Sequence, residues 1–112
     1  MISAKRRREC VAARRVAVVE WINRYLEEHP CVWCGEDNPI VLEFDHIDHG
    51  AKRWEIARAI ALVPSVASLE HEVSKTQVMC ANCHRIKTAQ ERGTIRWRRY
   101  GHIHRARSSK AR

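Results

Sequence analysis

The chain has 112 residues and carries 21 Lys and Arg against 13 Asp and Glu, a formal net charge of +8 at pH 7. This length favours one domain with a modest core, which a bound metal can stabilise. The positive charge predicts a polyanionic partner, with nucleic acid first and an anionic membrane second. Simple solubility is the alternative. However, the charge gathers at residues 5–8 and in residues 93–112, which hold seven Lys or Arg and no acid.

Two classes of protein are excluded by the hydropathy pattern. No apolar run approaches the ~20 residues needed to cross a bilayer, so we expect no membrane partner. The basic N-terminus lacks the apolar core of a signal peptide. We therefore expect a cytoplasmic protein, in which paired cysteines are more often metal ligands than disulfides.

The first predicted element is a helix over residues 9–28, which ends before Pro30. Residues 31–34 followed by Gly35 predict a tight knuckle. Residues 40–47 mix β-branched and aromatic side chains and predict a strand. The helix carries apolar residues at helical spacing: Val11, Val18, Val19, Ile22, Tyr25 and Leu26.

The second half of the chain predicts two short helices, a strand and a further helix. The short helices cover residues 52–62 and 65–75, and Ser65 is the expected N-cap of the second. We expect residues 77–79 to form a short strand and residues 84–92 to form a helix.

The pattern divides the chain into three segments of an α+β protein. Residues 1–30 are a basic N-terminal helix, residues 31–92 are the core with the knuckles, and residues 93–112 are a basic tail. The tail follows a helix-ending glycine and carries two aromatic residues that predict partial docking: Gly93, Trp97 and Tyr100.

Two Cys-x-x-Cys pairs, Cys31 with Cys34 and Cys80 with Cys83, are a strong metal signal. Zinc takes four ligands in a tetrahedron, and each tight turn can aim two thiolates at one ion. We therefore predict one structural zinc held by both pairs. A redox dithiol, which needs only one pair, is the alternative. Cys10 has no partner at ligand spacing, and we interpret it as a buried small apolar residue.

Asp45, His46 and His84 are the candidates for chemistry. Asp45 offers a hard oxygen ligand suited to a divalent cation such as Mg²⁺. A histidine such as His46 can be neutral near pH 7 and accept a proton from water. His84 follows a predicted zinc ligand, which fixes its backbone. Because neighbours in a strand point to opposite faces, Asp45 and His46 share a site only where the strand bends or ends. Other histidines are interpreted as surface or satisfied polar residues: His29, His71, His102 and His104.

At these residues the chain resembles the HNH endonucleases, which have the ββα-metal (His-Me finger) fold. The resemblance is to their zinc-containing bacterial and phage-encoded members. The matching segments are residues 31–34, 42–48 and 78–88. The resemblance implies a ββα-metal core whose structural zinc is bound by the two cysteine pairs.

By position, the resemblance implies that His46 is the general base. It also implies that Asp45 and His84 hold a catalytic Mg²⁺ or another divalent cation. Many members of the family orient the base with an asparagine shortly before the second knuckle. Here that position is near Lys75, so we expect a backbone carbonyl or another side chain to orient His46.

The implied function is metal-dependent hydrolysis of DNA phosphodiester bonds, which leaves 5′-phosphate and 3′-hydroxyl ends. A noncatalytic zinc-dependent DNA-binding module is the alternative. An RNA-binding zinc knuckle is disfavoured, because few aromatic residues are present to stack on bases. The residues expected to contact DNA are Arg85, Lys87, Arg96, Arg98 and Arg99. For Arg85 and Lys87, the alternative is that they lie on a solvated helix face.

Overall fold

The structure is a computed structural model that describes residues 2–110, and the side chains of residues 2–104. Within this part of the chain it is an α+β protein with five α-helices and one two-stranded antiparallel sheet. Short 3-10 turns lie at Pro39–Val41 (η1), His49–Ala51 (η2) and Ile56–Arg58 (η3). The main elements are α1 (Ala4–Glu28), β1 (Leu42–His46), α2 (Ala59–Leu62), α3 (Val66–Val73), β2 (Thr76–Cys80), α4 (Ala81–Arg92) and α5 (Ile95–Lys110).

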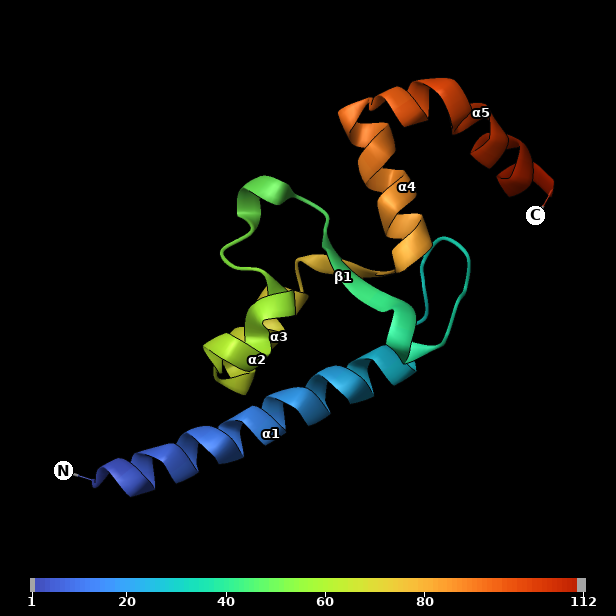
Figure 1. Ribbon diagram of the computed structural model, residues 1–112. Coiled ribbons are helices and arrows are strands. Elements are labelled where there is room, and N and C mark those ends of the chain that lie inside the picture. The colour runs from blue at the N-terminus through green and yellow to red at the C-terminus, as the bar shows by residue number, and fades with distance from the viewer. Residues whose placement is uncertain (1, 111–112) are drawn as a thin grey trace.

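Helix α1 begins earlier than predicted, because the Ser3 hydroxyl accepts a hydrogen bond from the Arg6 backbone N–H and caps it. Its N-terminal half extends away from the rest of the molecule (Figure 1). Val11 is therefore 42% exposed, although the helical spacing predicted a core position. In the C-terminal half, Val18 and Leu26 are buried.

The sheet forms because two distant segments pair. In the register, Leu42 lies opposite Cys80 and His46 lies opposite Thr76. The first strand is shorter than the predicted residues 40–47, since Pro39 starts a 3-10 turn capped by the Asn38 side chain. Helix α4 continues directly from β2, so the chain runs from sheet to helix without a loop (Figure 1).

Two apolar clusters hold these elements together, and α1 contributes to both. Ile22, Tyr25 and Phe44 pack against both clusters and join them into one core. The first cluster, which includes the cysteine pairs, is Leu26, Cys31, Leu42, Val78, Met79, Cys80 and Cys83. The second is Val18, Ile56, Ala59, Leu69 and Val73.

The segment between the strands contains less helix than predicted. Residues 52–62 form only η3 and α2, whereas α3 follows the prediction closely. Its N-cap is Ser65, whose hydroxyl accepts a hydrogen bond from the Ser68 backbone N–H at 3.1 Å, as expected.

The predicted basic tail is largely helical. Gly93 ends α4 in the left-handed conformation at φ 59°, as predicted, and α5 then begins at Ile95. The end of the tail, residues 111–112, lies outside the described residues. Gly101 of α5 is buried, and the ring of Trp97 lies so close to it that an added Cβ would be 2.8 Å away. The ring of His104 stacks on Trp33 at 5.8 Å, so α5 docks on the first knuckle.

No helix among the described residues is both long enough and apolar enough to cross a membrane.

Candidate functional site

The four cysteines of the two knuckles meet at one point. Their Sγ atoms all lie within 4.8 Å of one another, and Cys34 and Cys80 are 3.7 Å apart. In a tetrahedral site with Zn–S bonds of about 2.3 Å, the sulfur atoms lie about 3.8 Å apart. The cluster of Cys31, Cys34, Cys80 and Cys83 is therefore close enough to hold a metal ion such as zinc.

Local backbone geometry builds each half of this cluster. Gly35 takes a positive φ of 81°, which lets its N–H donate to the Cys31 carbonyl and tightens the first turn. The Val32 N–H donates to the Val78 carbonyl and ties this turn to β2. In the second knuckle, Cys80 is the N-cap of α4 and its sulfur accepts from the Cys83 N–H.

The crowded sulfur atoms differ in acidity. Burial raises the pKa of Cys31, but backbone N–H groups outweigh it and lower that pKa to about 6. Burial and the neighbouring thiols raise the pKa of Cys83. A second thiolate beside the first is thus disfavoured, and a divalent cation would remove this penalty.

Cys10 was predicted to be buried, and this prediction is wrong. The residue is exposed on the N-terminal half of α1, which extends away from the core. Its thiol therefore takes no part in packing or in the sulfur cluster.

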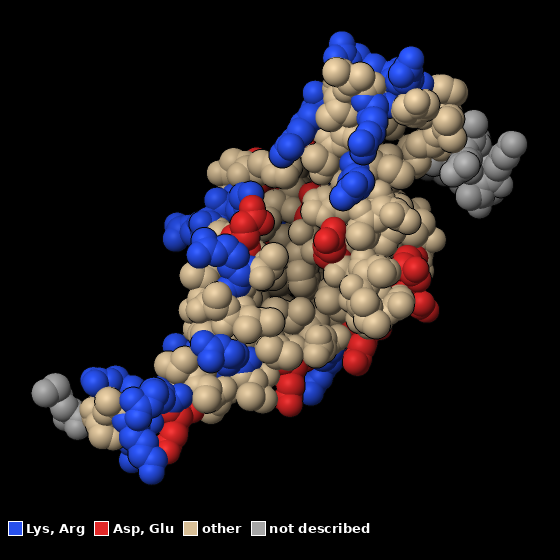
Figure 2. All heavy atoms as spheres, viewed as in Figure 1, with Lys and Arg blue, Asp and Glu red and all other residues tan. Residues whose placement is uncertain are grey.

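A pocket of about 450 Å³ lies where β1 ends. The middle of the face drawn in Figure 2 is hollowed, with acidic side chains at its edges. On the same face, Lys and Arg gather over the N-terminal end of α1 and around the α4–α5 junction. All three residues predicted to carry the chemistry, Asp45, His46 and His84, line this pocket. The other lining residues are Phe44, His49, Lys52, Glu55, Thr88, Glu91 and Arg92.

Asp45 is buried and faces α4. One carboxylate oxygen, Oδ2, accepts from Gln77 Nε2 at 3.0 Å and pairs with Lys87 Nζ at 3.0 Å. The other oxygen, Oδ1, lies 3.3 Å from His84 Nε2. Burial raises the pKa of Asp45, but these hydrogen bonds outweigh it and lower the pKa below its ordinary value. The carboxylate is therefore ionised and able to act as a ligand.

His84 lies between two carboxylates. Its Nδ1 is 3.0 Å from Glu43 Oε1, and its Nε2 faces Asp45. A carboxylate on one ring nitrogen commonly directs the other nitrogen toward a metal. Neighbouring ligands of an octahedral ion with bonds of about 2.1 Å lie about 3 Å apart. The 3.3 Å between Asp45 Oδ1 and His84 Nε2 fits that spacing.

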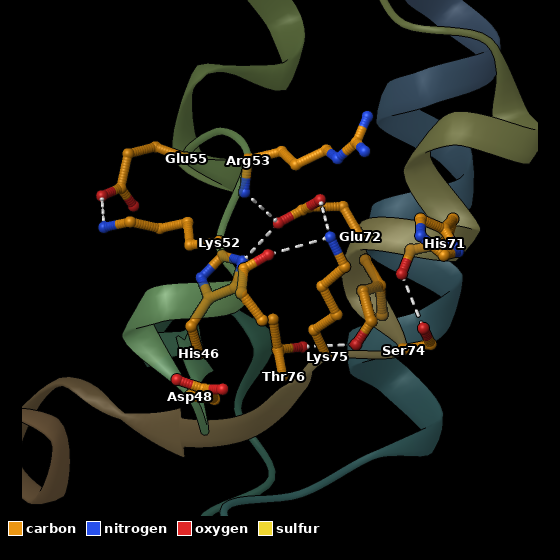
Figure 3. Close-up of polar contacts among 12 residues, drawn as sticks. His46, Asp48, Lys52, Arg53, Glu55, His71, Glu72, Ser74, Lys75 and Thr76 are labelled. Atoms are coloured by element: carbon orange, nitrogen blue, oxygen red, sulfur yellow. Dashed lines mark hydrogen bonds and ion pairs between the residues drawn. The ribbon is translucent and has the colours of Figure 1, made fainter.

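His46 points to the opposite side of the strand, toward α3. Its Nε2 lies 2.8 Å from Glu72 Oε2, and both side chains are buried (Figure 3). Because β1 ends at His46, this ring and Asp45 line one pocket despite facing different sides. The side chain that His46 contacts is thus that of Glu72. Lys75 contacts Glu72 rather than His46.

The basic residues expected to contact DNA fall into two groups. Lys87 points inward, where its Nζ pairs with Asp45 and Glu91. Burial lowers the pKa of Lys87, but these two hydrogen bonds outweigh it and raise the pKa. The others are exposed, one on α4 and three on the first turns of α5: Arg85, Arg96, Arg98 and Arg99.

Sequence reasoning did not find the residues that hold these groups in place, which are Glu43, Glu72 and Gln77. One signal was present for Glu72, because it shares a helical face with Leu69 and Val73. An acid among core residues needs a buried partner. The alternation of β1 places Glu43 on the face of Asp45, which could also have indicated its role.

Comparison of the chain with protein-family models, curated proteins and solved structures gave no match.

Proposed function

We propose that this protein is a DNA endonuclease that hydrolyses phosphodiester bonds with a histidine base and one divalent cation. The observation that carries the proposal is the meeting of Asp45 Oδ1 and His84 Nε2, 3.3 Å apart, in a pocket that His46 also lines. A carboxylate and an imidazole at ligand spacing beside a second imidazole provide the groups that metal-assisted hydrolysis needs.

In this mechanism, His46 takes a proton from the water that attacks phosphorus. Asp45 and His84 would hold Mg²⁺ or a similar ion, which would act as a Lewis acid and stabilise the negative charge that develops on the phosphate. Glu43 orients His84 by hydrogen bonding to its Nδ1. Burial of Asp45 and His46 keeps both groups in fixed positions.

The order of elements supports the same proposal. Strands β1 and β2 pair antiparallel, and α4 follows β2 at once and carries His84. This order is the one expected of a ββα-metal core, which we propose for residues 42–92. We further propose that the metal of the cysteine cluster is a structural zinc, because four sulfur ligands in a tetrahedron favour that ion.

The alternative is a noncatalytic zinc-dependent DNA-binding module, and one observation favours it. Lys87 Nζ lies 3.0 Å from Asp45 Oδ2, so the carboxylate is already paired with a positive charge of the protein. In that case the polar groups of the pocket would serve stability alone, and the exposed arginines of α5 would bind DNA.

Replacement of His46 distinguishes the two functions. With Mg²⁺ present, His46→Ala should lower plasmid cleavage by about 10²- to 10⁴-fold, because a general base typically contributes that much. DNA affinity and zinc content should stay at the parental values, and added divalent cation should not restore cleavage. His71→Ala, an exposed histidine on α3, is the matched control. Parental cleavage by the His46 variant would favour the binding module.

A further inference from the structure

Glu72 is one of the most completely buried side chains of the described residues, with 1% of its surface exposed. Its carboxylate contacts come from three other residues (Figure 3). Oε1 accepts from Lys75 Nζ at 2.9 Å. Oε2 accepts from the Arg53 backbone N–H at 3.1 Å and lies 2.8 Å from His46 Nε2. A buried carboxylate with this many partners is held in a single orientation.

The charge of Glu72 decides which nitrogen of His46 carries the proton. Burial raises the pKa of Glu72, but hydrogen bonds, with Lys75 first among them, outweigh it and bring the pKa to about 2. At neutral pH the carboxylate is therefore ionised and can only accept hydrogen bonds. The 2.8 Å contact then requires a proton on His46 Nε2, so in the neutral form of the ring the lone pair lies on Nδ1.

Lys75 and Arg53 keep this arrangement rigid. Besides Glu72, Lys75 Nζ also donates to the Ala51 carbonyl at 3.1 Å, which ties η2 to the end of α3. The Arg53 N–H fixes Oε2 from the segment that follows η2. Three parts of the chain therefore converge on one carboxylate, and that carboxylate contacts the candidate base.

We propose that Glu72 is the positioning residue of the base: it holds the His46 ring in place and selects the tautomer whose Nδ1 takes the proton from water. This inference rests on the proposed nuclease function. Carboxylates play the same part behind other catalytic imidazoles, where they orient the ring without touching the substrate. Glu72 would thus orient the His46 ring, a role that was expected of an asparagine near position 75.

The tautomer can be measured in the unaltered protein, without any substitution. Ring ¹⁵N NMR of the zinc-loaded chain at mildly alkaline pH should show a protonated Nε2 and an unprotonated Nδ1 for His46. Comparison with His46→Gln assigns the signals. A proton on Nδ1 in the parent would overturn the proposal.

Glu72→Gln tests the consequence for catalysis. Its amide carries no charge and can donate as well as accept, so the preference for the tautomer with Nε2 protonated should weaken. The kcat for DNA cleavage should fall by about 10²- to 10⁴-fold at unchanged KM, because a ring in the wrong tautomer cannot act as the base. Glu70→Gln, on the exposed side of the same helix, should match the parent in kcat and tautomer.

The two proposals fail in different ways. A parent that cleaves no DNA with divalent cations contradicts the nuclease function itself. A parent that cleaves DNA, together with a folded Glu72→Gln variant of equal kcat, contradicts only the role of Glu72. Zinc content and circular dichroism establish that the variant is folded. If it does not fold, the tautomer of the parent decides the question.

Discussion

Asp45 and His84 should respond to substitution differently from His46, because we expect them to act through a bound cation. Asp45→Asn keeps the shape of the side chain but removes the charge, so the cation affinity should fall. Cleavage should drop at low Mg²⁺ and recover partly at high Mg²⁺. His84→Ala should behave alike, and a titration of cleavage rate against Mg²⁺ measures both. Asp48→Asn is the matched control, since Asp48 caps η2 through an oxygen that asparagine retains. A loss of cleavage independent of Mg²⁺ would contradict the ligand role.

Glu72 makes the fold sensitive to acid. Its pKa is about 2 in the folded chain against an ordinary value of 4.5, so the unfolded chain binds more protons between these values. The stability that it contributes is complete above about pH 4.5 and is lost as the pH falls toward 2. The free energy of unfolding, measured with urea, should therefore fall less steeply between pH 4.5 and pH 2 for Glu72→Gln than for the parent. Glu70→Gln should keep the parental slope, and identical slopes for Glu72→Gln and the parent would rule out this source of acid sensitivity.

At the scale of elements, the two knuckles should depend on their metal. Replacement of any one of the four clustered cysteines with Ser, for example Cys80→Ser, should reduce bound zinc and lower the unfolding temperature. The reason is that metal binding contributes directly to folding in such sites. Elemental analysis and thermal unfolding check this, and the parent should hold one zinc per chain. Cys10→Ser is the control, because Cys10 is exposed and distant from the cluster in the chain. A folded parent without zinc would remove the structural role of the metal.

The first turns of α5 should bind phosphates with little sequence preference. Each neutralised phosphate contributes about 0.9 to the slope of log affinity against log salt concentration. A variant with Arg96, Arg98 and Arg99 changed to Gln should lower that slope by up to about 2.7 if all three contact phosphate. These residues are exposed, so the fold should be unaffected. Arg24→Gln, on the exposed side of the packed half of α1, is the control. An unchanged slope would show that the arginines are only solvated.

How far the sequence predicts each element depends on the range of the interactions that form it. Ser65 as an N-cap and Gly93 as a helix end were correct, because capping and positive φ are local properties. The burial of Val11 was wrong, because helical spacing shows which residues share a face but not whether anything covers it. The helix of the tail was missed because its apolar residues are few, and its docking depends on the contact of His104 with the distant Trp33.

The candidate site shows the same limit. Residue types and spacing were enough to predict the cysteine cluster and to single out Asp45, His46 and His84. They could not show that His46 meets Glu72, since 26 residues separate the two and folding alone brings them together. Nor could they show that Lys87 turns inward to Asp45, because most lysine side chains are exposed to solvent.

At the scale of the whole molecule, three tasks are carried by different parts. The cysteine cluster and the core that includes it hold the fold. Basic side chains gather at the N-terminal end of α1 and around the α4–α5 junction (Figure 2). Two of them, Lys52 and Arg92, also line the pocket. The chemical groups line the pocket at the end of β1. Under the proposed function, we therefore expect substitutions to affect DNA binding and DNA cleavage separately.

The most direct test of the account is the incubation of plasmid DNA with the zinc-loaded protein after free metal has been removed. We predict no cleavage until a divalent cation is added, and then cleavage with Mg²⁺, Mn²⁺ or Ni²⁺ that leaves 5′-phosphate and 3′-hydroxyl ends. His46→Ala, assayed alongside, excludes a contaminating nuclease. Binding of the plasmid without cleavage under every cation would contradict the account and identify the protein as a DNA-binding module.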